Sequence, residues 1–192
     1  MNKTRILLIF CLLLSSFAAV SAQVQYKLIA TKKTSTAEKE INEAADAGFR
    51  FDGVSGGKTA FGGAEVVIIM SKPANADSRG RYRYKLLATS RTSTMQKELQ
   101  QAGDNGFEYC GQTVYESAFG GDEVVVILEK DVDAKIRKFE YKLLATSKTS
   151  TMQKEISQAG DANFEFVGLT TGKTALGGNE LVVILRREIV SR

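Results

Sequence analysis

The apolar positions in the middle of the chain predict a short strand followed by a helix. Residues 84–89 alternate, with the first, third and fifth side chains on one face of a strand. Met95, Leu99 and Ala102 then recur at spacings of four and three residues, which is one apolar stripe of a helix. Gly106 tolerates the left-handed backbone in which helices commonly end. We therefore expect an amphipathic helix that packs with one face.

Two further strands follow this helix. Residues 107–111 alternate between apolar and more polar positions, so one face of this strand is expected to be buried. Residues 124–128 are apolar on both faces, which is typical of a central strand that is covered on each side. We therefore expect this third strand between the first and the second, antiparallel to both, with the helix crossing over one face of the sheet.

The same unit occurs three times in the sequence. Residues 26–72, 84–130 and 141–187 align without a gap at offsets of 58 and 57, and they share the motifs Tyr-Lys-Leu, Thr-Ser-Thr and Gly-Gly-x-Glu. The residues expected to end the helices are Gly48, Gly106 and Asn163. The expected fold class is α+β, with three β-α-β-β repeats, each a small, mainly antiparallel sheet of order 1-3-2 with one helix on one face.

The units are expected to pack on one another. A helix covers only one face of each sheet, whereas Val67, Ile69, Val125 and Ile127 point to the other face. Even a domain of about 60 residues buries only about 60% of its unfolded surface, so a single unit is marginal alone. Linkers of eight or nine residues reach about 30 Å. That reach permits a row or an arrangement around a pseudo-threefold axis.

The first 22 residues have the layout of a secretory signal. Lys3 and Arg5 precede an apolar run at 6–14, and small residues precede a cleavage site between Ala22 and Gln23. We expect a secreted or periplasmic protein without a transmembrane segment after cleavage. The expected divisions are a signal peptide at 1–22, unit 1 at 23–72, a linker at 73–81, unit 2 at 82–130, a linker at 131–138 and unit 3 at 139–192.

Charge and composition exclude several classes of function. Signal cleavage removes two of the 26 basic residues and none of the 22 acidic ones, so the net charge falls from +4 to +2. The basic residues are interspersed with acidic ones, which argues against a nucleic-acid partner. The chain has no histidine, and Cys110 is the only cysteine after residue 22, so a disulfide, a histidine-based triad and the usual metal and haem ligand sets cannot form. We expect no cofactor and no catalytic residue.

The repeats resemble a small bacterial domain-of-unknown-function family. That family has a Tyr-Lys-Val strand, an amphipathic helix, a Gly-Trp-Glu-Leu-Val turn into the second strand, and a closing apolar strand that ends in Lys or Arg. The matching stretches are 84–86, 106–109 and 126–130 in one unit, and 141–143, 163–167 and 184–187 in another. Phenylalanine replaces the family's tryptophan in every unit, Asn163 replaces its glycine, and the Gly-Gly loop is an addition. The resemblance implies a fold without implying an activity.

Two motifs resemble functional sites but lack residues that such sites require. Gly57-Lys58-Thr59 ends like a phosphate-binding loop, but the glycine required five residues earlier is Asp52, and a strand follows in place of a helix. Cys110 has no histidine to activate it as a nucleophile.

The start of each helix is the best candidate for a ligand site. A basic residue precedes a Thr-Ser-Thr sequence there, and free amides, hydroxyls and a cation together suit an anion. The candidate ligand-binding residues are Lys33, Thr36, Arg91, Thr94, Lys148 and Thr151. The alternative is simple capping, in which Ser93 caps the helix and Gln96 completes a capping box.

The sequence therefore favours a non-enzymatic exported repeat protein, acting as a protein-interaction or structural module of the cell envelope or extracellular space. The expected partner is an unidentified protein or a second copy of the chain. The alternative is a small anionic-ligand binder that uses the helix N-termini.

Overall fold

A computed structural model describes residues 23–59, 63–75, 77–116, 122–173 and 178–190. Unit 1 contains β1 (Val24–Thr31), α2 (Thr34–Asp46), β2 (Arg50–Thr59) and β3 (Gly63–Pro73). Unit 2 contains β4 (Tyr82–Thr89), α3 (Thr92–Asp104), β5 (Glu108–Glu116) and β6 (Asp122–Asp131). Unit 3 contains β7 (Lys138–Thr146), α4 (Thr149–Asp161), β8 (Glu165–Lys173) and β9 (Asn179–Ile189). The expected signal peptide lies outside the described residues.

Each unit forms one three-stranded antiparallel sheet, and the predicted fold class is confirmed. The strand orders are β1-β3-β2, β4-β6-β5 and β7-β9-β8, so the apolar third strand is central in every sheet. The helices end as predicted, because Gly48, Gly106 and Asn163 all have positive φ angles. These residues turn the chain directly from the helix into the second strand.

The second strands differ from their predicted form. Each is nine or ten residues long and continues past the glycine at which the apolar alternation ended. The pairing register shifts between Phe51 and Gly53, and likewise in the other two units, so Cys110 occupies a bulge in β5. The predicted clean alternation was therefore wrong at this point, since one extra residue re-aims the side chains that follow.

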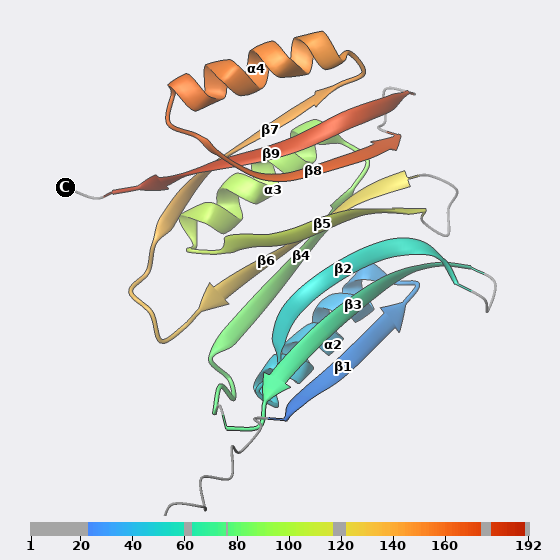
Figure 1. Cartoon of the computed structure of the whole chain (residues 1–192), viewed down its shortest axis with the longest axis vertical. Coiled ribbons are helices and arrows are strands. Elements are labelled where there is room, and N and C mark those ends of the chain that lie inside the picture. Colours follow the sequence, from blue (N-terminus) through green and yellow to red (C-terminus); the bar gives the residue numbers. More distant parts are fainter. Residues whose placement is uncertain (1–22, 60–62, 76, 117–121, 174–177, 191–192) are drawn as a thin grey trace, which may run out of the picture.

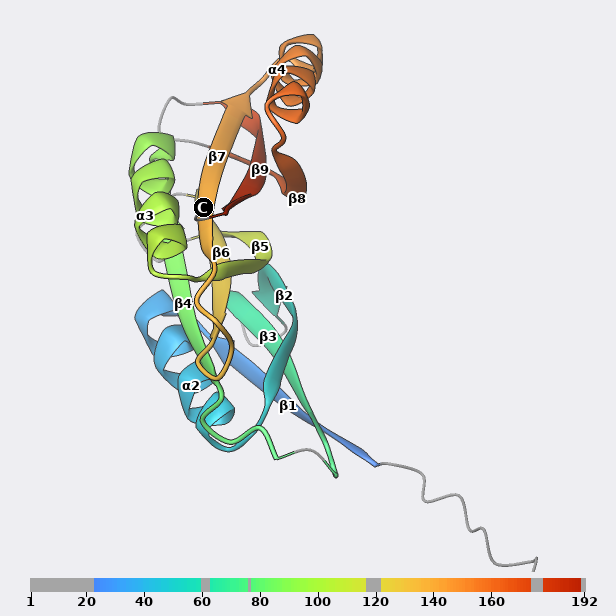
Figure 2. The same ribbon diagram turned by 90° about the vertical axis from the view of Figure 1, so that its left-hand side faces the viewer.

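The three units stack in a row, with a helix wedged between consecutive sheets. α2 lies between β1 and β4, and α3 lies between β4 and β7, while β2 packs on β5 and β5 packs on β8. Figures 1 and 2 show this arrangement along the long axis, with unit 1 at one end and α4 at the other. Of the two arrangements left open by the sequence, the row is the one observed.

The core is shared between the units. One cluster joins Ile41 and Ile68 of unit 1 to Tyr84 and Ile127 of unit 2, and a second joins the helix side of unit 2 to the outer side of unit 3. A third cluster lies within unit 3. The second and third sheets therefore gain the cover for their second face from the unit before them. None of the helices in the described ranges is long and apolar enough to cross a membrane.

Candidate functional site

The three helices start at the predicted basic residues, but without a side-chain cap. Lys33, Arg91 and Lys148 are themselves the extended N-cap residues, and no side chain caps the helix at any of the three. The predicted capping box was therefore wrong, because the serine falls inside the first turn. The hydroxyl oxygen of the threonine two residues earlier accepts a hydrogen bond from each N-cap amide, at 3.1–3.3 Å.

The six candidate ligand-binding residues form three separate pairs. Lys33, Arg91 and Lys148 are exposed, and the threonines three residues later in the first helical turn are half-buried. Each pair lies in its own layer of the stack (Figure 1). The structure brings each basic residue beside its own helix start and does not combine the three pairs into one site.

In units 1 and 2, the side chain at the capping-box position, Glu38 or Gln96, instead binds the next unit. Leu86 N–H donates to Glu38 Oε2 at 2.9 Å, and Asn42 exchanges two hydrogen bonds with the backbone of Tyr84, at 2.9 and 3.0 Å. Both side chains project from α2 onto the free edge of β4. They supply the edge with partners that a further strand would otherwise provide. We refer to this pair of helix positions as the edge clamp.

The same clamp operates between units 2 and 3. Gln96 Nε2 donates to Tyr141 O at 2.8 Å, and Leu143 N–H donates to Gln96 Oε1 at 2.7 Å. Gln100 Oε1 accepts from Tyr141 N–H at 3.1 Å. Sequence reasoning missed this role, although the unbroken repeat of polar residues at these two helix positions was a visible signal.

Glycines let the units approach closely at two further places. A Cβ on Gly103 of α3 would lie 2.2 Å from the carbonyl oxygen of Phe139. In the bulges, a Cβ on Gly111 would lie 3.0 Å from the ring of Phe51, and one on Gly168 would overlap the side chain of Tyr109. The bulge glycine of each following unit thus receives the aromatic residue of the unit before it.

Ion pairs link the second strand of one unit to the third strand of the next. Arg50 Nη2 lies 2.7 Å from Glu129 Oε1, and Arg186 Nη1 lies 2.5 Å from Glu108 Oε1. Arg50 and Glu108 occupy equivalent positions, as do Glu129 and Arg186, so the second pair has the charges exchanged. We call these the clasp pairs.

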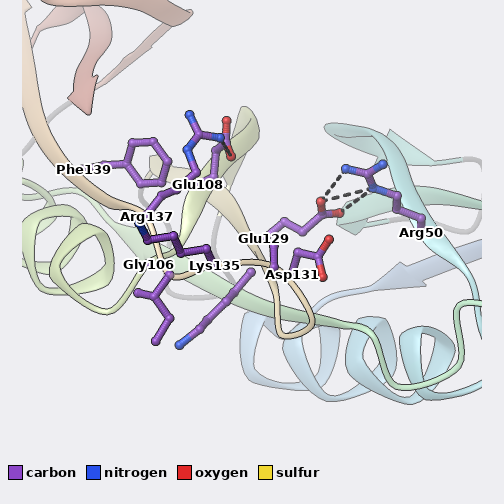
Figure 3. A pocket seen from close by; sticks show the side chains of 11 residues that line it. Arg50, Gly106, Glu108, Glu129, Asp131, Lys135, Arg137 and Phe139 are labelled. Carbon is purple, nitrogen blue, oxygen red and sulfur yellow. Dashed lines mark hydrogen bonds and ion pairs between the residues drawn. The ribbon is translucent and has the colours of Figure 1, made fainter. Parts of the chain in front are cut away.

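The first clasp pair borders a pocket of about 180 Å³ at the junction of the units (Figure 3). Glu129 is buried and also accepts a hydrogen bond from Tyr84 Oη at 2.6 Å. Burial, followed by that hydrogen bond, holds the pKa of Tyr84 far above its usual range. The hydrogen bond to Glu129 raises the pKa of Arg50 as well. Tyr84 therefore stays protonated and Arg50 stays charged, and both hold two units together through Glu129.

Two acidic residues near this junction, Asp131 and Glu188, have lowered pKa values and are poor proton donors. A hydrogen bond from Arg81 lowers the pKa of Asp131, and one from Arg137 lowers the pKa of Glu188. Burial raises the pKa of the Cys110 thiol to about 12, which disfavours the nucleophilic thiolate. Within the described ranges, no group of three or more histidine, cysteine, aspartate or glutamate residues could hold a metal ion.

Each end of the stack exposes a surface whose equivalents inside the stack are buried between two units. At one end, the outer face of the first sheet exposes Tyr26 and Leu28. At the other end, no unit in the described ranges covers α4, and Phe166 and Leu169 are more than half exposed. We define the N-terminal face as Tyr26, Leu28, Gly53, Val67 and Ile69. We define the C-terminal face as Gln153, Ser157, Gly160, Phe166 and Leu169.

Known proteins give no guide to the use of these surfaces. Comparisons with protein-family models, with curated proteins and with solved structures found no match to this chain.

Proposed function

We propose that this chain is an exported, non-enzymatic protein that works through protein–protein contact, as an interaction or structural module of the cell envelope or extracellular space. The signal-like pattern of residues 1–22 supports export and cleavage before Gln23. The N-terminal face is the contact surface, and its partner is a protein.

The exposure of β1 carries this proposal. Tyr26 is 71% exposed and Leu28 is 62% exposed, whereas the equivalent Tyr84 and Leu86 of unit 2 are 4% and 9% exposed. Burying one large apolar side chain contributes about 1.5–3 kcal/mol. Contiguous exposed apolar surface commonly marks an interaction site. The repeat itself provides the comparison, because the same residues are covered wherever a unit precedes them.

The environment of the charged groups supports a non-enzymatic role. The buried carboxylate, Glu129, is held by Arg50 and Tyr84 in a bridge between two units. Such a bridge holds two units together, which is a structural role for this carboxylate. Function resides in specific sites on a fold. The most distinctive feature of the described surface is the uncovered outer face of the first sheet.

A photo-crosslinking amino acid at Leu28, introduced in the cells that naturally produce the protein, tests the proposal. We expect a discrete cross-linked species from Leu28. We expect none from the matched position Lys97, which is exposed on α3 and lies outside both faces. Absence of any cross-link from Leu28 would overturn the proposed function.

Thermal unfolding with inorganic phosphate tests the alternative, a binder of small anions. A ligand at 100 times its Kd stabilises the folded state by about 2.7 kcal/mol. A saturable shift that disappears when Lys33, Arg91 and Lys148 are all changed to alanine would favour the helix N-termini as the functional sites. We expect no such shift.

A further inference from the structure

We propose that the partner of the N-terminal face is the C-terminal face of a second copy of the same chain, so that copies stack head to tail and continue the row of units. This inference rests on the proposed function and names its partner. The two interfaces inside the chain are formed by equivalent positions of successive units. Each end of the stack exposes the positions that form one side of such an interface.

The edge clamp is the first matching element. Gln153 of α4 occupies the position of Gln96 in α3 and is the same residue type. On β1, Tyr26 and Leu28 match in type and position the two residues that Gln96 binds on β7. Gln153 is exposed, and its Nε2 donates to Ser157 Oγ of its own helix at 3.3 Å, with no bond to a strand edge among the described residues. By exchanging this exposed local bond, the amide could bind the edge of β1 in another copy as Gln96 binds the edge of β7.

The helix glycine of the second interface is the second matching element, and the first interface has Ala45 at this position. Gly103 in α3 is buried against the backbone of Phe139 and the ring of Tyr141, where a Cβ would overlap both. Gly160 is its equivalent in α4, and a Cβ there would meet nothing within 4 Å. Glycine in a helix costs up to about 1 kcal/mol relative to alanine. Close approach of a strand explains that cost at Gly103 and would explain it at Gly160.

The aromatic contact to the bulge glycine is the third matching element. Phe166 of β8 is 58% exposed, although its equivalents in units 1 and 2 rest on the bulge glycine of the next unit. Gly53 is the bulge glycine of unit 1, and a Cβ there would also meet nothing within 4 Å. Phe166 of one copy and Gly53 of the next thus complete a contact that is made twice inside the chain.

The charges permit this junction. At the positions of the clasp pairs, Glu165 of one copy would face Ser71 of the next, and no like charges meet. Arg83 forms an ion pair with Asp46 between units 1 and 2, and the corresponding pair at the junction is Gln25 with Asp161. The junction therefore lacks both ion pairs, and we expect it to be weaker than the internal interfaces and to depend on protein concentration.

The symmetry of the contact determines which kind of assembly forms. The two faces differ, so the interface is heterologous, and repetition produces an open filament or a closed ring. A symmetric dimer would instead pair two N-terminal faces. Variants that block one face at a time distinguish these arrangements.

Sedimentation velocity of the chain from Gln23 onwards, over a wide concentration range, is the direct measurement. We expect the mass to rise with concentration through dimers to longer assemblies. Leu28→Glu and Phe166→Glu should each lower the association constant by more than about tenfold. Ile136→Glu is the matched control, because Ile136 is 64% exposed and lies outside both faces. All three changes are at exposed positions, and circular dichroism checks that the fold is retained.

Mixing the two blocked variants gives the decisive result. Leu28→Glu keeps its C-terminal face and Phe166→Glu keeps its N-terminal face, so an equal mixture should form dimers and nothing longer. A mixture that stays monomeric, or a parent chain that stays monomeric at every concentration, would overturn the inference. If Leu28 then cross-links to a different protein, the proposed function stands and only the identity of its partner is wrong.

Discussion

Gly103 and Gly160 occupy the same position in α3 and α4, but only Gly103 lies against a neighbouring unit. Alanine at Gly103 would place a Cβ 2.2 Å from the carbonyl oxygen of Phe139, a backbone atom that moves only with its strand. Alanine at Gly160 would project into open space. We expect Gly103→Ala to destabilise the protein and Gly160→Ala to stabilise it.

The magnitudes follow from two opposing effects at these positions. Replacing glycine by alanine in a helix contributes up to about 1 kcal/mol of stability. Overpacking of a close contact costs about 1–3 kcal/mol. Gly103→Ala should therefore lower the free energy of unfolding by up to about 2 kcal/mol, which is up to about 8 °C in Tm for a chain of this size. Gly160→Ala should raise Tm by about 1–4 °C.

Urea and thermal unfolding, followed by circular dichroism at low protein concentration, measure both changes. The two variants carry the same chemical substitution at equivalent helix positions, so each serves as the control for the other. The reasoning is refuted if Gly103→Ala is as stable as the parent chain, or if both variants shift in the same direction by the same amount.

Three further predictions concern the interfaces and the buried groups. Gln96→Leu should cost about 1–3 kcal/mol by leaving two strand-edge groups unpaired, whereas Gln153→Leu should leave the monomer's urea midpoint unchanged. Glu129→Gln removes the charge that pairs with Arg50 and should lower the free energy of unfolding by about 1–2 kcal/mol. The loss is modest because the arginine is half exposed and water partly screens the ion pair. An unchanged urea midpoint would contradict this. Burial raises the pKa of Cys110 from 9.0 and of Tyr109 from 10.0, both to about 12, so the folded state keeps protons that the unfolded state loses. Stability should therefore fall as the pH rises from about 9 to 12, and a Tm that is flat over this range would contradict the burial of these groups.

The fold of each unit could be predicted because its signals are local. The apolar run of β6 indicated a central strand, and Gly106 indicated the helix end. The capping box at Ser93 was wrong because the same sequence pattern serves two purposes. Gln96 has the spacing of a capping residue, and its side chain instead binds the edge of β7.

The relations between units were less visible in the sequence. The uncovered apolar face of each sheet correctly indicated that the units pack together. Whether they form a row depends on contacts such as the clasp pair of Arg50 and Glu129, which lie 79 residues apart. The clasp pairs also exchange their charges between the two interfaces, so a search for a repeated residue type at these positions fails. Only the pairing in space shows that the two contacts are equivalent.

The packing of the last helix leads to a prediction about its dynamics. α3 and α4 differ at only two of their 13 positions, so their intrinsic helix propensities are close. α3 buries four residues between two sheets, whereas α4 buries only Met152 and Ala159. Backbone amides exchange through local opening, whose free energy rises with the number of buried contacts.

Hydrogen exchange followed by mass spectrometry should therefore find faster exchange in α4 than in α3 for the dilute monomer. Raising the concentration should slow exchange in α4 and in the edge strand β1 together, because head-to-tail contact covers both. The Leu28→Glu variant provides the control, since its α4 should stay unprotected when it is alone at high concentration. Equal exchange in the two helices of the monomer would show that packing between units contributes little to helix stability. Protection of β1 without protection of α4 would point to a partner that differs from the chain itself.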